Sequence, residues 1–299
     1  MDKNPHENPK HLPHESGPSN RGAEAVPSHV YDKEFYLTNC ADYDLFKSTG
    51  GLHMSERLGG PFRMAGVRPG QKILDVGCGR GEVLVQIARA GADAYGIDYS
   101  EDSVAMCLET RERLKEHLRG EYHVQRMDAK QLQFPDAFFD MVFMVDIIEH
   151  LHDWELEKIL GEVVRVLKPS GKLVAHTAPN RWFLDIGYPY YTRWINWMAR
   201  GVVRRVVGDD DLENKVPTRR DLRSDYERVM HINEQTFPQL ARMMKRFFPR
   251  VTMAPLFNTH ADNVAFRLYD LVARGYPISR VWPLHLIFAD AFYAVGQKQ

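Results

Sequence analysis

Short apolar runs alternate with longer amphipathic segments through most of the chain. The runs hold four to six residues and are rich in Val, Ile, Leu, Met and Phe, as buried strands are. In the longer segments apolar residues recur at helical spacing. The predicted strands are residues 72–76, 94–97, 122–126, 141–145, 172–177, 251–256 and 292–296, and the predicted helices are residues 82–90, 101–118 and 154–167. This alternation predicts an α/β fold built from βαβ units around a mostly parallel sheet.

Polarity also divides the chain into regions. Residues 1–28 nearly lack large apolar side chains, so we expect a disordered tail. Residues 29–66 carry aromatic side chains between polar ones and predict a helical cover over the core, which leaves 67–299 as one α/β domain. Two long segments, 182–231 and 260–283, interrupt the alternation and are predicted to be lid insertions after the fifth and sixth strands.

Composition excludes several classes of protein. Lys plus Arg number 39 and Asp plus Glu number 40, so the net charge of −1 does not favour a nucleic-acid partner. The cysteines Cys40, Cys78 and Cys107 form no CxxC pair, so neither a disulfide framework nor a zinc site is predicted. With no signal-peptide pattern and no apolar run near the ~20 residues of a membrane span, we expect a cytoplasmic protein.

A glycine-rich turn follows the first predicted strand. Gly77, Gly79 and Gly81 let the backbone approach a ligand, and the helix that begins after them offers free N–H groups. Asp75, near the end of the strand, would repel a pyrophosphate but would hold an ammonium group or ribose hydroxyls. The turn therefore favours S-adenosylmethionine over a dinucleotide.

The next two predicted strands also end at acidic residues. Asp98 lies about 20 residues after the glycines, where a carboxylate can accept from both ribose hydroxyls, although it could instead cap the helix that begins near Glu101. Asp128 could accept from the adenine amine, with Met127 against the ring, although it could also be an ordinary loop acid. Because parallel strands place these ends on one sheet edge, we expect a single ligand site there.

Three segments, residues 74–81, 138–151 and 165–173, resemble motifs of the class I S-adenosylmethionine-dependent methyltransferases. The resemblance covers roughly residues 68–179. It implies a doubly wound, mostly parallel, seven-stranded sheet of the Rossmann-like methyltransferase fold, with the last strand antiparallel, and it makes 67–299 the methyltransferase domain.

Carried over by position, the resemblance and the strand ends assign a cofactor site. The glycine turn would hold the methionine moiety, which Val145 and Asp146 would border, and Tyr99 would lie beside the adenine. The residues expected around S-adenosylmethionine are Asp75, Gly77, Cys78, Gly79, Gly81, Asp98, Tyr99, Met127, Asp128, Ala129, Val145 and Asp146.

The chemistry that this cofactor supplies is simple. Its methyl group is already activated on a sulfonium, so an enzyme aligns a nucleophile and needs no metal. The predicted bases for a hydroxyl acceptor are His150, His176 and His231. Each histidine has an alternative interpretation: His150 could be a polar residue at a helix start, His176 a buried strand residue, and His231 a residue before a helix cap. We therefore expect methyl transfer to a hydroxyl, in preference to an amine, of a small-molecule, glycan or lipid-linked acceptor.

Two other functions fit parts of the pattern. A non-catalytic regulatory or scaffold protein could bind S-adenosylmethionine through the same glycine turn. A nicotinamide dehydrogenase is disfavoured by Asp75 and by Glu82, which stands where a dinucleotide fingerprint has its third glycine. The sequence makes no prediction about oligomeric state.

The first insertion contains an unusual amphipathic segment, residues 188–207. Read as a helix, it places Arg193, Asn196, Arg200 and Arg204 on one face and tryptophans on the rest. This composition is typical of a helix at a membrane surface, here the inner face, but it would also suit a lid whose apolar face covers the substrate pocket. Ubiquinone-biosynthesis O-methyltransferases, which the chain distantly resembles, have a comparable insertion and act on a lipid-tailed phenol.

Overall fold

A computed structural model describes residues 24–38, 40–207, 217–218, 220–257 and 281–299. Most of the predicted tail, the acidic run at 209–211 and nearly all of the second insertion lie outside these residues. Among the described residues, no helix is both long and apolar enough to cross a bilayer.

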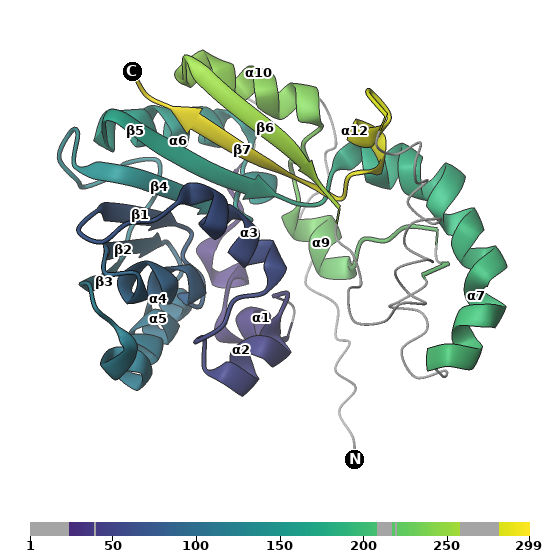
Figure 1. Ribbon diagram of the computed structural model, residues 1–299, viewed down its shortest axis with the longest axis horizontal. Coiled ribbons are helices and arrows are strands. Elements are labelled where there is room, and N and C mark those ends of the chain that lie inside the picture. Colours follow the sequence, from purple (N-terminus) through teal and green to yellow (C-terminus); the bar gives the residue numbers. More distant parts are fainter. Residues whose placement is uncertain (1–23, 39, 208–216, 219, 258–280) are drawn as a thin grey trace.

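The centre of the molecule is one seven-stranded sheet (Figure 1). Its order is β3-β2-β1-β4-β5-β7-β6, and every strand runs parallel to the others except β7, which pairs antiparallel with both β5 and β6. The strands are β1 (Lys72–Val76), β2 (Asp93–Asp98), β3 (Tyr122–Arg126), β4 (Phe139–Val145), β5 (Leu167–Thr177), β6 (Arg250–Leu256) and β7 (Ala291–Gln297). The predicted sheet, including its antiparallel last strand, is confirmed.

Helices cover both faces of the sheet (Figure 1). The face with α3, α4 and α5 is opposite the face with α6 and α10. The helices of these two layers are α3 (Glu56–Ala65), α4 (Glu82–Arg89), α5 (Glu101–Leu114), α6 (Asp153–Val166) and α10 (Phe237–Phe247). The remaining elements are α1 (Lys33–Thr38), α2 (Tyr43–Thr49), α7 (Arg193–Val207), α9 (Asp225–Met230), α12 (His285–Phe288), the π-helix η4 (Phe183–Thr192) and the 3-10 turns η1 (Ser28–Val30), η2 (Lys115–His117) and η3 (Ile148–His150).

Strand alternation explains the two cores. Along β4, Val142 and Met144 point into the cluster beneath α6 and α10, whereas Met141 and Phe143 point into the cluster beneath α3, α4 and α5. All four are fully buried. Burial of such side chains contributes about 1.5–3 kcal/mol each, so the two cores fix the sheet register on which the site depends.

Two elements differ from their predicted bounds by more than two residues. The fifth strand, predicted over 172–177, begins already at Leu167; in the added segment the pairing with β4 shifts register and Ser170 adopts a φ of +63°. The second predicted helix ends at Leu114 and continues only as the 3-10 turn η2. Neither difference moves a strand end that carries a predicted site residue.

Candidate active site

The glycine turn joins β1 to α4 in a conformation that requires glycine. Gly77, Gly79 and Gly81 have φ values of +72°, +51° and +87°. A Cβ on Gly77 would lie 2.9 Å from the Ile147 side chain, and one on Gly81 would lie 2.4 Å from the Tyr122 hydroxyl. Gly77 thus keeps the turn close to the loop after β4, and Gly81 lets α4 pack closely against the sheet.

Asp98 ties the end of β2 to this turn. One carboxylate oxygen accepts from the Gly79 N–H at 3.1 Å, and the other accepts from the Ser100 N–H at 2.9 Å. The cap of α5 is Ser100, whose hydroxyl accepts from the Ser103 N–H. The alternative reading of Asp98 as the helix cap is therefore wrong.

Asp75 and Asp98 are two buried carboxylates on the same edge of the sheet. They are only 3% and 5% exposed, and burial raises the pKa of both above the usual range. Among the residues that the structure describes, no lysine or arginine forms an ion pair with either one. A ligand that is cationic or donates hydrogen bonds would supply the missing partners.

These residues line a cavity of about 580 Å³, a size within the range of small-molecule sites. Eleven of the twelve predicted cofactor residues lie on its wall. The exception is Gly81, which packs against Tyr122 and Cys107. The eleven are Asp75, Gly77, Cys78, Gly79, Asp98, Tyr99, Met127, Asp128, Ala129, Val145 and Asp146.

Asp128 differs from the other two strand-end acids. Its side chain is 55% exposed, and its carboxylate accepts from the Lys130 N–H at 2.9 Å and lies 3.3 Å from the Lys130 ammonium. It therefore stabilises the loop after β3 as well as bordering the cavity. Its predicted contact with adenine stays a prediction.

The three predicted histidine bases are not together. His150 and His231 both line the cavity, with ring centroids 4.8 Å apart. Burial lowers the pKa of His150 to about 3, with a further contribution from His231, and burial with the nearby Arg223 lowers the pKa of His231 to about 4. Both imidazoles are therefore neutral near neutral pH.

His176 lies inside β5 and is not on the cavity wall. Its Nδ1 is 2.5 Å from an Asp146 carboxylate oxygen, and burial lowers its pKa to about 3. Asp146 has a φ of +53° and also forms an ion pair with Arg57 from α3. His176 is thus placed to position Asp146 rather than to contact a ligand in the cavity.

A roof over the cavity comes from segments without a recognisable motif. Tyr31, Phe35 and Tyr36 from the N-terminal region pack with Tyr226 and Met230 of α9, and all five line the cavity. In Figure 1, α9 lies between the N-terminal helices and α7. Only the aromatic composition of residues 29–66 and the predicted lid at 182–231 pointed to these segments.

The roof is fastened to the glycine turn by Arg80. This buried guanidinium forms an ion pair with Glu82 at 2.7 Å and donates to the backbone carbonyls of Tyr36 and Ala41 at 3.2 and 2.8 Å. Nothing in the sequence indicated this role, because the Tyr36 and Ala41 carbonyls lie 44 and 39 residues away from Arg80 in the chain.

Helix α7 turns its polar face toward the protein. Arg193, Asn196 and Arg200 bond with Pro217 and Thr218. The outward face carries the exposed side chains Trp194, Trp197 and Met198, at 60%, 67% and 62% exposure. No described residue of α7 lines the cavity. The structure therefore does not support the alternative in which α7 is a lid whose apolar face covers the pocket.

Comparisons with known proteins agree with this geometry. Residues 74–175 match the family described as "Methyltransferase domain". Over 146 residues the chain is 31% identical to the ubiquinone/menaquinone biosynthesis C-methyltransferase UbiE of Vibrio parahaemolyticus, covering 47% of this chain and 54% of that protein. Over 113 residues it is 37% identical to phosphoethanolamine N-methyltransferase 2 of Caenorhabditis elegans, covering 38% of this chain and 25% of the relative. The chain thus spans about half the length of the UbiE relative, and less of the other.

A solved structure shares the fold. The phosphoethanolamine N-methyltransferase 2 of Haemonchus contortus, in complex with phosphomonomethylethanolamine and S-adenosylhomocysteine, aligns with 90% of this chain and 60% of its own, with a TM-score of 0.51 and 20% identity. The three sequence motifs, the strand order and the family match together identify residues 74–175 as a methyltransferase domain of the class I S-adenosylmethionine-dependent family.

Proposed function

We propose that this chain binds S-adenosylmethionine in the cavity and transfers its methyl group to an acceptor. The observation that carries the proposal is the pair of buried carboxylates, Asp75 and Asp98, beside the glycine turn and without a cationic partner among the described residues. Asp75 would accept from the ammonium of the cofactor, and Asp98 from its ribose hydroxyls. Met127, Asp128 and the neighbouring Ala129 would border the adenine.

The chain itself would supply orientation, exclusion of water and a place for the proton. The cofactor brings a methyl group already activated on sulfur. The aromatic roof would shield the reacting groups from solvent, and Val145 and Asp146 would border the methionine end. His150 and His231 are neutral imidazoles on the same cavity wall, so either could accept a hydrogen bond from the acceptor, although their lowered pKa values make them weak bases.

We propose a hydroxyl of a small-molecule, glycan or lipid-linked molecule as the acceptor. Two neutral imidazoles on the cavity support a hydroxyl, because each can accept its hydrogen bond and orient it, and an alcohol or phenol must lose a proton on methylation. An amine can attack once it is unprotonated. The relatives include a C-methyltransferase and an N-methyltransferase by name, so they do not indicate which atom is methylated. The proposal of an oxygen atom is based on the cavity residues of this chain. The second candidate function is a regulatory protein that binds the cofactor without catalysis.

Calorimetry and product analysis separate these functions. We expect S-adenosylmethionine to bind and NAD not to bind, because Asp75 repels a pyrophosphate. With extract fractions that contain the acceptor, mass spectrometry should detect S-adenosylhomocysteine. Binding of NAD without S-adenosylmethionine would contradict the proposal, and cofactor binding without product in any fraction would favour the regulatory protein.

We also propose a peripheral membrane contact through residues 188–207. The support is the outward face of α7, where Trp194 and Trp197 are exposed while the polar face bonds with the protein. Amphipathic helices with such aromatic faces bind at the boundary between headgroups and acyl chains. A contact of this kind would bring the cavity near a lipid-linked acceptor.

Vesicle co-sedimentation tests this contact. With vesicles of phosphatidylcholine and phosphatidylglycerol, the double substitution Trp194→Ala and Trp197→Ala should weaken binding about tenfold or more, given about 1.5–3 kcal/mol for a fully buried large apolar side chain. The matched control replaces Met64 and Leu108, two exposed apolar residues away from α7, and should bind like the wild type. Equal binding by the wild type and the tryptophan variant would exclude the contact.

A further inference from the structure

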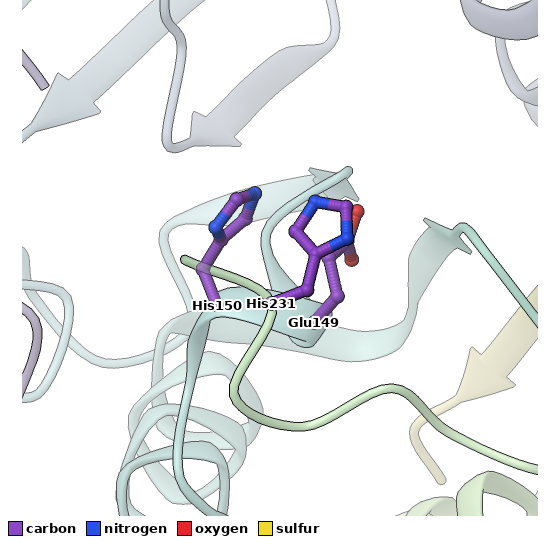
Figure 2. A group of neighbouring side chains, drawn as sticks. All are labelled: Glu149, His150 and His231. Atoms are coloured by element: carbon purple, nitrogen blue, oxygen red, sulfur yellow. The ribbon is translucent and has the colours of Figure 1, made fainter. Parts of the chain in front are cut away.

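Glu149, His150 and His231 form a compact cluster on the cavity wall. Each offers one ligand atom, and these atoms lie within 4.8 Å of one another. Figure 2 shows the three side chains extending to the same side from two separate segments, the turn η3 and the residue that follows α9. All three line the cavity that holds the glycine turn.

Hydrogen bonds from the surrounding protein fix the positions of these side chains. The Thr177 hydroxyl donates to one Glu149 carboxylate oxygen at 2.8 Å. His150 Nδ1 lies 3.2 Å from the Met230 carbonyl, to which it can donate, and 3.1 Å from the Tyr31 hydroxyl. The tautomer that carries its proton on Nδ1 leaves a lone pair on Nε2. Histidines that bind metals are oriented in this way, with one ring nitrogen donating to a carbonyl.

The cluster places the carboxyl group of Glu149 in a buried site. Glu149 is 2% exposed, and no lysine or arginine of the described segments forms an ion pair with it. The two imidazoles add lone pairs, and the buried Nδ1 of His231 has no hydrogen-bond partner in the described part of the chain. A buried carboxylate and an unsatisfied ring nitrogen are each costly, and a bound cation would satisfy both.

We propose that Glu149, His150 and His231 bind a divalent transition-metal ion whose open coordination positions face the cavity. Two histidines and one carboxylate are a ligand set that holds zinc or iron(II) and leaves positions for other ligands. Methyl transfer from a sulfonium needs no metal, so no metal site is predicted from the sequence. The signal was hidden because the three ligands come from segments that only the fold brings together.

The ion would act on the acceptor, and this part rests on the proposed function. An acceptor hydroxyl that binds at an open position would be held in place and made more acidic. Its proton would pass to solvent, its oxygen would form the bond to the methyl carbon, and the electron pair of the breaking carbon–sulfur bond would remain on sulfur as S-adenosylhomocysteine. His150 and His231 would then serve as ligands rather than as bases.

Cobalt(II) is a suitable probe, because its visible absorption reports on bound ligands. The full-length protein, stripped with a chelator, should bind one equivalent of cobalt and develop visible bands that EDTA abolishes. Glu149→Gln and His231→Gln should each weaken binding about 100-fold or more, since even residues outside the ligand set cost 10–100-fold. The matched control, His123→Ala on the exposed side of β3, should bind cobalt like the wild type.

Two further measurements distinguish failure of the metal site from failure of the proposed function. Acetohydroxamate, a bidentate oxygen ligand, should change the cobalt spectrum if coordination positions are open, and an unchanged spectrum would contradict them. Calorimetry with S-adenosylmethionine shows whether each variant is folded and tests the proposed function separately. Cofactor binding with no cobalt binding, or with wild-type cobalt affinity in Glu149→Gln and His231→Gln, would overturn the metal site alone. Cobalt binding without cofactor binding would overturn the proposed function and leave the metal site standing.

Discussion

Replacing Arg80 with alanine is expected to lower the free energy of unfolding by about 3–5 kcal/mol. The substitution leaves the buried Glu82 carboxylate without its partner at 2.7 Å and removes the donors to the Tyr36 and Ala41 carbonyls. Each of these losses destabilises the folded protein strongly because the groups are shielded from water. Urea denaturation followed by circular dichroism measures the change.

The chain offers a matched control in Arg63→Ala. Arg63 also pairs with a glutamate, Glu56, but both side chains are largely exposed. Such surface ion pairs contribute about 0–1 kcal/mol, so this variant should unfold close to the wild type. A change below about 1 kcal/mol for Arg80→Ala would contradict the idea that this ion pair fastens the roof.

Replacing Asp98 with alanine is expected to weaken S-adenosylmethionine binding by about 1–3 kcal/mol, or about 5–150-fold. The variant removes the carboxylate proposed to accept from the ribose and also frees the Gly79 N–H that it holds. Because Ser100 caps α5, the helix itself should remain intact. Calorimetry gives the affinity, and a thermal melt gives the stability.

Two companion variants separate the ligand contact from the local structure. Asp98→Asn keeps an acceptor for only one of the two N–H groups that Asp98 holds, Gly79 and Ser100, and it loses the charge. It should therefore lose less stability than Asp98→Ala and still bind the cofactor more weakly than the wild type. Asp128→Ala, at a largely exposed residue, should lose less affinity than Asp98→Ala. Unchanged affinity in Asp98→Ala would mean that this carboxylate serves the glycine turn only.

The strand ends could be predicted because local rules determine them. Short apolar runs identify the strands, and parallel strands in neighbouring positions must end on one edge, which brings Asp75, Asp98 and Asp128 to one cavity. Three alternating glycines identify the turn because few other residues adopt its φ values. Each of these signals, the apolar run that ends near an acid and the glycine turn, spans only a few residues of the sequence.

The other side of the cavity depends on contacts between distant segments. Nothing near His231 in the chain indicates that it lies beside Glu149 and His150. Arg57 reaches Asp146 only because α3 packs on the sheet. For α7 the spacing separated the two faces but could not say which one points inward, because that depends on carbonyls near Pro217.

The short helices of the roof have a consequence for how ligands exchange. Six- and seven-residue helices such as α1, α2 and α9 are not stable alone in water, so they hold their places through tertiary contacts, among them those of Arg80 and of the aromatic side chains. Segments of this kind detach from a protein at a small fraction of its global unfolding free energy. The rate of turnover would then be set by how often the roof opens. A substitution that stabilises the closed roof would slow the release of product as well as the loss of substrate.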